Sequence, residues 1–322
     1  MNRDYSLTPK EVAEILNIKK NTVYELIKRG DLAAYRVGRK LRIEPEDVEA
    51  YKKSRKEYVN PLPIAGTFSV PHPSATHENN EFQSLPLSGL VIYGQDIILD
   101  ILGHHIEENS DGLRVYRKHA GSFPGLLALY EGKADIASAH LWDSETDSYN
   151  IPYVRRFLPG IPAIILHLAV RTQGFYVKKN NPLKIEKWED LTRPELRLAN
   201  REPGSGTRVL LDEQCRVRNI NRLNINGYHN IERSHTAVAI AVARNMADVG
   251  LGNQKAAMQI EEIDFIPLHS ERYELVIKEE DINKPAVQLL LATLASKPFK
   301  EEVEGLGGYQ LSEMGQLVAR IL

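Results

Sequence analysis

The sequence predicts an α/β protein in two parts, a small helical module with a hairpin followed by a larger domain of alternating strands and helices. Two observations predict this division. Helical periodicity and turn residues fill residues 6–56, whereas strand-like and helix-like segments alternate from Gly89 onward. Between them, residues 57–87 carry five prolines among Ser, Thr, His and Asn, which predicts an extended linker. We therefore expect domains at residues 1–56 and 88–322.

The N-terminal module is predicted to contain two helices, a hairpin and a last helix. Thr8 can cap the first helix, and Glu11 stands at the spacing of a capping box. The second helix is expected to stop at Gly30. The expected helices are at about 9–16, 20–29 and 44–53, and the expected strands are at 33–37 and 40–43. This order of elements is that of a winged helix-turn-helix.

Basic charge is concentrated in this module. Residues 1–56 hold 14 Lys and Arg against 9 Asp and Glu, whereas the rest of the chain holds 27 against 34. This asymmetry indicates a nucleic-acid partner for the module, although a merely solvated basic face would give the same balance. Asn21 and Thr22 are short enough to reach base edges, whereas lysines suit phosphates. The candidate DNA contacts are Lys19, Lys20, Asn21, Thr22, Tyr24, Lys28, Arg36, Arg39, Lys40 and Arg42.

The run from Thr22 to Ile43 follows the pattern tVyxlIxxGxLxayrvGrxxrI. It strongly resembles the excisionase-like, MerR-related group of winged helix-turn-helix modules, and the resemblance covers essentially all of residues 6–56. The resemblance implies that the second helix enters the major groove of double-stranded DNA. It also leaves open an architectural DNA-binding protein of the excisionase type, in which residues 88–322 would not control DNA affinity.

From Gly89 the chain shows the βαβ pattern of an open, mostly parallel sheet. The expected strands are at 90–93, 113–116, 136–138, 161–170, 174–177, 196–200, 248–251 and 272–277. The expected helices are at 96–108, 122–131, from 206 to about 215, and at 237–244, 285–296 and 312–321.

The stretch NREPGSGTR at residues 200–208 is the most informative in this domain. Two glycines in a turn between a strand and a helix leave backbone N–H groups bare, and the helix N-terminus adds partial positive charge. Ser205 and Thr207 add hydroxyl donors, while Arg201 and Arg208 flank the turn. These groups predict a pocket for a small anion. A turn that begins a helix without binding any ligand is the alternative interpretation.

Other candidates lie where strands pass into helices, the edge at which open α/β sheets bind ligands. Asp96 is expected to cap its helix, and if it faces the cleft a zwitterionic or cationic ligand is favoured. The two arginines could instead pair with Glu202 and Asp212, and we expect one of them in the cleft. The predicted ligand-binding residues are Gln95, Asp96, Ser122, Phe123, His140, Arg201, Ser205, Gly206, Thr207, Arg208 and His235.

Residues 88–322 resemble the cytoplasmic, type-2 periplasmic-binding-protein-like domains found fused to helix-turn-helix modules. The segments that carry the resemblance include AGSFPGLLALYEGKADIASAHLWD at 120–143, NREPGSGTR, and SHTAVAIAVARNMADVGLG at 234–252. The resemblance implies two lobes that close on a ligand, at about 88–172 with 270–322 and at about 173–269. It also implies molybdate or tungstate as the effector. Gln95 stands where a serine is frequent in the family, which keeps an organic metabolite open as the effector.

Several classes of protein are disfavoured. The chain has one cysteine, Cys215, no secretory signal and no apolar run of membrane-spanning length, so we expect a cytoplasmic protein without a membrane partner. It lacks a nucleophile elbow at Ser205, a paired metal-ligand set and a Walker sequence, so we expect no enzyme, metal or cofactor. Helix-turn-helix proteins usually read paired half-sites, so we expect a homodimer or higher homo-oligomer. The sequence predicts a ligand-responsive transcription regulator.

Overall fold

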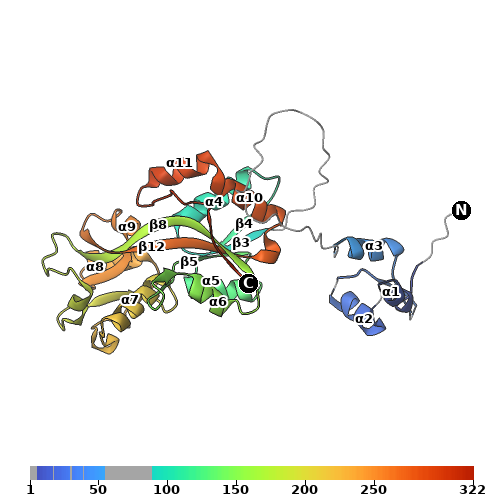
Figure 1. Cartoon of the computed structure of the whole chain (residues 1–322), viewed down its shortest axis with the longest axis horizontal. Helices are drawn as coiled ribbons and strands as arrows, with labels where there is room; N and C mark the ends of the chain where they lie inside the picture. The colour runs from blue at the N-terminus through green and yellow to red at the C-terminus, as the bar shows by residue number, and fades with distance from the viewer. Residues whose placement is uncertain (1–5, 17, 30, 39, 55–88) are drawn as a thin grey trace. The chain divides into compact units, whose positions relative to one another are not determined.

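The computed structural model describes residues 6–16, 18–29, 31–38, 40–54 and 89–322 (Figure 1). The chain divides into two compact units, one holding residues 6–54 and the other residues 89–322. The predicted linker at 57–87, the helix stop at Gly30 and the candidate DNA contact Arg39 lie outside the described residues.

The N-terminal unit has the predicted order of elements: α1 (Pro9–Leu16), α2 (Lys20–Arg29), β1 (Tyr35–Val37), β2 (Lys40–Arg42) and α3 (Pro45–Ser54). The capping box is confirmed, because Thr8 N donates to Glu11 Oε2 at 2.6 Å and Glu11 N donates to Thr8 Oγ1 at 3.4 Å. The strands β1 and β2 form an antiparallel hairpin. Val12, Val23 and Ile43 share one small core, which fixes α2 relative to the hairpin.

The larger unit is built on a nine-stranded sheet in the order β10-β9-β11-β8-β12-β5-β3-β4, with β13 also paired to β8. Its strands are β3 (Leu90–Tyr93), β4 (Val115–Lys118), β5 (Ile136–Ala139), β8 (Ala163–Lys178), β9 (Leu198–Arg201), β10 (Ile231–Glu232), β11 (Val249–Asn253), β12 (Ile263–Lys278) and β13 (Leu317–Ile321). A separate hairpin is formed by β6 (Trp142–Asp143) and β7 (Ser148–Tyr149).

Two long strands connect the lobes. β8 and β12 each have 16 residues and pair antiparallel along nearly their whole length, from Ile263 opposite Lys178 to Lys278 opposite Ala163. Figure 1 shows them crossing the whole unit side by side. One end of this pair joins β3, β4 and β5 in lobe 1, and the other end joins β9, β10 and β11 in lobe 2. The hinge is therefore a strand pair rather than a loop.

Helices cover both faces of each lobe. In lobe 1, α4 (Ile97–Glu108), α10 (Pro285–Ala295) and α11 (Lys297–Leu306) pack together on one face, while α5 (Ser122–Tyr130) and α6 (Ile151–Phe157) cover the other (Figure 1). In lobe 2, α7 (Gly206–Val217) packs over one core, and α8 (His235–Ala243) with the short α9 (Gln254–Ala257) over another. Each lobe has cores of its own, and Val209 of α7 also packs into the lobe 1 core beneath α5 and α6.

Three predictions about this unit are wrong. The sheet is mixed rather than mostly parallel, because the chain enters lobe 2 along β8 and returns antiparallel along β12. The strands expected at 161–170 and 174–177 are one continuous strand. The helix expected at 312–321 is instead a turn followed by β13, which pairs with β8. The periodicity of a short apolar run such as 317–321 is compatible with either a strand or a helix. Here the segment forms a strand because it pairs with β8.

Candidate functional site

The candidate nucleic-acid interface lies on α2 and the hairpin. α2 buries Val23 and Leu26, so its other side faces solvent. The predicted contacts on and before this helix, Lys19, Lys20, Asn21, Thr22, Tyr24 and Lys28, are all exposed, as are Arg36 and Lys40 on the hairpin. Arg42 is half-buried and donates to the Ser6 carbonyl at 3.3 Å, so it also anchors the start of the module. The exposed face of α2 and the hairpin thus carries these basic side chains together with Asn21 and Thr22.

The Gly-Ser-Gly-Thr turn lies at the contact between the lobes. Phe123 N of lobe 1 donates to the Gly204 carbonyl of lobe 2 at 3.0 Å. A methyl group on Gly121 would lie 2.9 Å from Ser205 Cα, and one on Gly206 would lie 2.4 Å from His140 Nδ1. Such approaches exclude any side chain at these glycines. The turn therefore faces the opposite lobe, as its predicted role requires.

The hydroxyl groups that were predicted to bind a ligand form hydrogen bonds within the protein. Ser205 Oγ donates to the Glu202 carbonyl at 2.9 Å and accepts from Arg208 N at 3.3 Å, so it caps α7. Thr207 Oγ1 donates to Gln173 Oε1 at 3.3 Å. Ser122 Oγ accepts from His140 N at 3.2 Å. In this conformation a ligand would have to displace protein partners to use the Ser205 or Thr207 hydroxyl as a donor.

Both flanking arginines are buried and paired with neighbouring carboxylates. Arg201 donates from Nε and Nη2 to the two carboxylate oxygens of Glu202, at 2.8 and 2.7 Å. Its Nη2 also donates to Gln95 Oε1 of lobe 1 at 2.7 Å. Arg208 stays within lobe 2, where it donates to Asp212 Oδ1 at 3.3 Å. Arg201 is therefore the arginine of this pair that crosses between the lobes.

A buried ion network lies at the hinge beside this turn. Arg171 of β8 donates from Nε to Glu271 Oε1 of β12 at 2.7 Å and from Nη1 to Asp96 Oδ2 at 2.5 Å. Glu271 Oε2 lies 2.6 Å from His140 Nδ1 and accepts from Gln173 Nε2 at 2.8 Å. The network joins residues of lobe 1 to both hinge strands, and Gln173 extends it to α7 of lobe 2.

Two pKa shifts describe the electrostatics of this network. Burial alone would raise the pKa of Glu271, but the charge of Arg171 and the contact with His140 outweigh burial and lower it to about 2. Burial and the neighbouring Asp96 carboxylate raise the pKa of Tyr309. The Tyr309 hydroxyl therefore stays protonated and donates to Asp96 Oδ1 at 2.6 Å. Asp96 also caps α4 by accepting from Ile98 N at 3.0 Å, as predicted.

A polar cavity of about 410 Å³ opens between the lobes next to this network. The N-termini of α4 and α8 meet there and favour negative charge, whereas the Asp96 and Asp100 carboxylates in the lining oppose it. Lobe 1 contributes Gln95, Asp96, Ile97, Asp100, His119 and Tyr309, and lobe 2 contributes Arg233, Ser234, His235, Thr236, Asn253, Lys255, Ala256 and Gln259. Arg233 is exposed and has no hydrogen bond or ion pair within residues 89–322.

His235 is a neutral hydrogen-bond donor to this cavity. Burial, followed by the charge of Arg201, lowers its pKa well below the usual value. Its Nδ1 accepts from Asn253 N at 3.3 Å, so the neutral ring carries its proton on Nε2. The cavity thus combines a neutral donor, an unpaired guanidinium and two helix N-termini.

The structure gathers some predicted residues and separates others. Gln95, Asp96 and His235 line the cavity, and Arg201 is bonded to Gln95. Phe123 instead lies in a separate apolar groove. The sequence analysis missed the cavity residues Arg233, Lys255 and Tyr309 and the hinge residues Arg171, Gln173 and Glu271. Polar residues within long, otherwise apolar strands were the signal that could have revealed the hinge residues.

Family comparisons agree with this architecture. A model described as a helix-turn-helix domain matches residues 6–56, and one described as a PBP superfamily domain matches residues 103–295. The chain belongs to the PBP superfamily. Both matched models describe binding domains rather than enzymes, and they suggest DNA for the first unit and a small ligand for the second. In the described part of the chain, no helix is long and apolar enough to cross a membrane.

Individual relatives extend the comparison. The uncharacterized protein YvgK of Bacillus subtilis is 40% identical over 318 residues, which cover 99% of each chain. A Clostridium perfringens protein, solved with bound phosphate and named as a phosphate ABC transporter substrate-binding protein, has a TM-score of 0.52 at 14% identity over 69% of this chain and 98% of its own. A Clostridium difficile domain named for molybdenum transport has a TM-score of 0.43 at 13% identity, with the same coverage. The two family matches and the fold of the Clostridium perfringens protein confirm the predicted fold class, an α/β PBP-like domain in a chain with a helix-turn-helix. They do not identify the ligand.

Proposed function

We propose that this PBP superfamily protein is a cytoplasmic, ligand-responsive transcription regulator. Its residues 1–56 bind double-stranded DNA, residues 57–87 act as a linker, and residues 88–322 bind the effector. The observation that carries the proposal is a polar cavity lined from both lobes, in the same chain as a helix-turn-helix unit with an exposed basic face. A ligand that contacts both lobes stabilises one arrangement of them, which is how binding at one site alters another.

We propose a small oxyanion, molybdate or tungstate first, as the effector. The N-termini of α4 and α8, the His235 Nε2 donor and the neighbouring Arg201 all favour negative charge. The predicted residues Ser122, Ser205, Gly206 and Thr207 lie in the contact between the lobes, outside the lining of this cavity.

A zwitterionic organic metabolite is the second candidate effector. Asp100, whose side chain is 42% exposed, lines the cavity together with Arg233, so the cavity presents charges of both signs. The Asp96 carboxylate is already held by Arg171 and Tyr309. Its volume of about 410 Å³ also falls within the range of sites for organic ligands, about 300–1,000 Å³. A ligand with an ammonium group and a carboxylate would satisfy both charges.

The proposed mechanism couples lobe closure to DNA binding. The Arg201–Gln95 bond and the Phe123–Gly204 backbone bond both cross between the lobes, so ligand binding can act on contacts that already exist. Homodimers would place two α2 helices on paired half-sites. A coupling free energy of about 1–3 kcal/mol between effector and DNA is sufficient for roughly five- to 150-fold control.

Calorimetric titration of the full chain with molybdate, tungstate, phosphate, sulfate and a panel of amino acids tests the effector. We expect heat with one oxyanion, and His235→Ala to weaken that binding by about tenfold because a hydrogen bond to a charged group is lost. His229→Ala is the matched control, since His229 is exposed and outside the cavity lining. Heat with an amino acid and with none of the oxyanions would select the zwitterionic effector.

DNA binding is tested on sequences that the full chain selects from a random pool. The affinity of the full chain for the selected DNA should change when the effector identified by calorimetry is added. An affinity that does not change with any bound ligand, and that a fragment lacking residues 89–322 reproduces, would contradict a regulator and favour the architectural alternative.

A further inference from the structure

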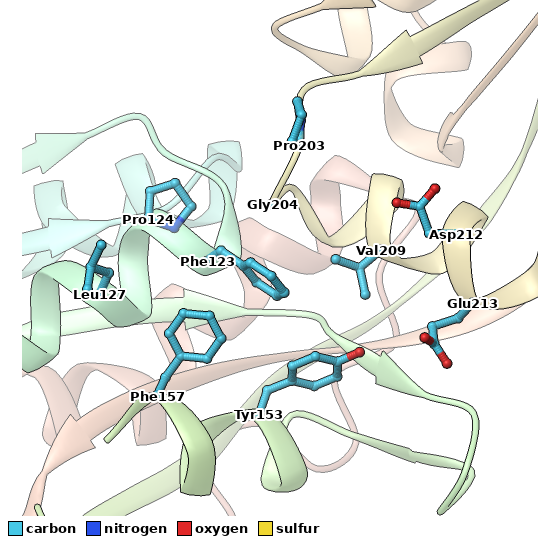
Figure 2. A pocket seen from close by; sticks show the side chains of 10 residues that line it. All are labelled: Phe123, Pro124, Leu127, Tyr153, Phe157, Pro203, Gly204, Val209, Asp212 and Glu213. Carbon is cyan, nitrogen blue, oxygen red and sulfur yellow. The ribbon is translucent and has the colours of Figure 1, made fainter. Parts of the chain in front are cut away.

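A second cavity, an apolar groove of about 610 Å³, crosses the boundary between the lobes (Figure 2). Lobe 1 contributes Phe123, Pro124, Leu127, Tyr153 and Phe157 from α5 and α6, and lobe 2 contributes Pro203, Gly204, Val209, Asp212 and Glu213 from the turn and α7. None of these residues lines the polar cavity. The groove is therefore a separate space, and it requires both lobes.

Three aromatic rings form the lobe 1 wall of the groove. The Phe123 ring centroid lies 4.8 Å from that of Phe157 and 5.8 Å from that of Tyr153, and both ring pairs are tilted. In Figure 2 the three rings lie around the same opening, with Val209 across from Phe123. Rings in this arrangement offer apolar surface to an occupant.

The charged lining of the groove is entirely acidic. Asp212 and Glu213 lie on its lobe 2 side, and none of its ten lining residues is basic. Asp212 uses Oδ1 for Arg208 and Tyr228, and Glu213 uses Oε2 for Ser144 and Arg216. Asp212 Oδ2 and Glu213 Oε1 accept no hydrogen bond from the residues that the structure describes. Each carboxylate is thus paired with an arginine and keeps one oxygen without a protein donor. In Figure 2 the Asp212 carboxylate points away from the three rings, so Glu213 is the carboxylate that an occupant of the groove can reach.

Glu213 is ionised at neutral pH. Burial would raise the pKa of Glu213, but hydrogen bonds from Arg216 and Ser144 outweigh burial and lower it. These partners also hold the carboxylate in place, so an occupant does not have to order it. A fixed negative charge beside an aromatic wall favours a positively charged group with an apolar body.

We propose that this groove binds a small organic cation, an aromatic or aliphatic amine. The body of the amine lies against Phe123, Tyr153 and Phe157, and its ammonium group contacts the free Oε1 of Glu213. Because the walls come from both lobes, the site is complete only when the lobes are closed. An occupant therefore favours the closed form and raises the affinity of the polar cavity for its own ligand. The proposal does not depend on which ligand the polar cavity binds.

The experiment compares tryptamine with tryptophol, its uncharged alcohol counterpart, by ligand-observed NMR titration of the full chain at pH 7.4. We expect tryptamine to bind, and tryptophol to bind several-fold more weakly. Glu213→Gln should weaken tryptamine binding by about two- to fivefold, the range of a partly exposed ion pair, and leave tryptophol unchanged. Glu189→Gln is the matched control, because Glu189 also pairs with an arginine, Arg218, but lies outside the groove.

Leu127→Lys provides an independent variant if Glu213→Gln destabilises the fold. Leu127 lines the groove and is 47% exposed, so a lysine there is tolerated and places a positive charge at the opening. It should weaken tryptamine binding and not tryptophol binding. The proposal is overturned if tryptamine does not bind, if both probes bind equally, or if neither variant changes tryptamine affinity.

Discussion

Glu271→Gln should destabilise the larger unit by about 3 kcal/mol at pH 7. The folded protein lowers the pKa of Glu271 from 4.5 to about 2, and about 2.5 pKa units correspond to roughly 3 kcal/mol. The same magnitude, about 3–5 kcal/mol, is typical for removing one partner of a buried ion pair. Glu271 is 1% exposed, so solvent screening does not reduce this figure. The glutamine leaves Arg171 with Asp96 alone and His140 without its carboxylate.

The pH dependence of this effect has a definite sign. Because the folded state lowers the pKa, ionised Glu271 stabilises the fold fully above about pH 4.5, and this stabilisation is lost as the pH falls toward 2. The difference in unfolding free energy between the wild type and Glu271→Gln should shrink by about 1 kcal/mol between pH 7 and pH 3.5. Carboxylates outside this ion network titrate equally in both proteins and cancel in the comparison.

Urea unfolding followed by tryptophan fluorescence measures this difference. The two tryptophans, Trp142 and Trp188, both lie in residues 89–322, so the signal reports on the larger unit alone. Glu189→Gln serves again as the control and should cost less than about 1 kcal/mol, because its ion pair is exposed. The reasoning is refuted if Glu271→Gln costs less than about 1 kcal/mol at pH 7. It is refuted equally if the difference stays constant down to pH 3.5.

Four further predictions concern the turn and the DNA module. Ser205→Ala should lower the free energy of unfolding by about 1 kcal/mol, because the side-chain cap of α7 is lost. It should leave the affinity for the effector unchanged. A tenfold loss of affinity in calorimetry would show instead that the Ser205 hydroxyl contacts the effector. Gly206→Ala should prevent lobe closure, because its methyl group would lie 2.4 Å from an imidazole nitrogen; small-angle scattering should then show no ligand-induced compaction. Gly305→Ala, which meets nothing within 4 Å, should compact normally, and equal compaction of both variants would contradict the steric argument. Lys28→Ala should lower the slope of log affinity for DNA against log salt concentration by about one unit, the value for one lost phosphate contact, and an unchanged slope would exclude that contact. Asn21→Ala should relax the preference for the selected DNA sequence. If the variant selects the same sequence as the wild type, Asn21 does not contact a base.

Local features of the fold could be predicted because their causes lie within a few residues. The Thr8–Glu11 capping box joins residues three apart, and Asp96 caps a helix whose first turn follows it directly. The alternation of strands and helices was sufficient for the fold class, since buried strands and amphipathic helices differ in period.

The hinge could not be predicted, because its partners are far apart in the sequence. The bond from Arg171 to Glu271 joins residues 100 positions apart, and the pairing of β8 with β12 decides both the direction of the sheet and the position of this pair. Contacts between the lobes at the candidate site were equally beyond prediction from local sequence. Gly206 was predicted from its turn, yet the contact with His140 that makes glycine necessary there comes from the other lobe.

The return of β12 into lobe 1 has a consequence for biosynthesis. Lobe 2 has all its strands once the chain has emerged to about residue 269, but the core of lobe 1 includes Tyr273, Leu275, Val287 and Phe299 together with Leu90 and Ile92. While a ribosome is still translating that final segment, the core formed by β3 and α4 lacks the apolar side chains that the end of β12, α10 and α11 supply. A nascent chain that stalls there exposes surface that invites aggregation or chaperone capture. Premature stop codons in the last fifth of the gene should therefore yield insoluble protein rather than a working single lobe.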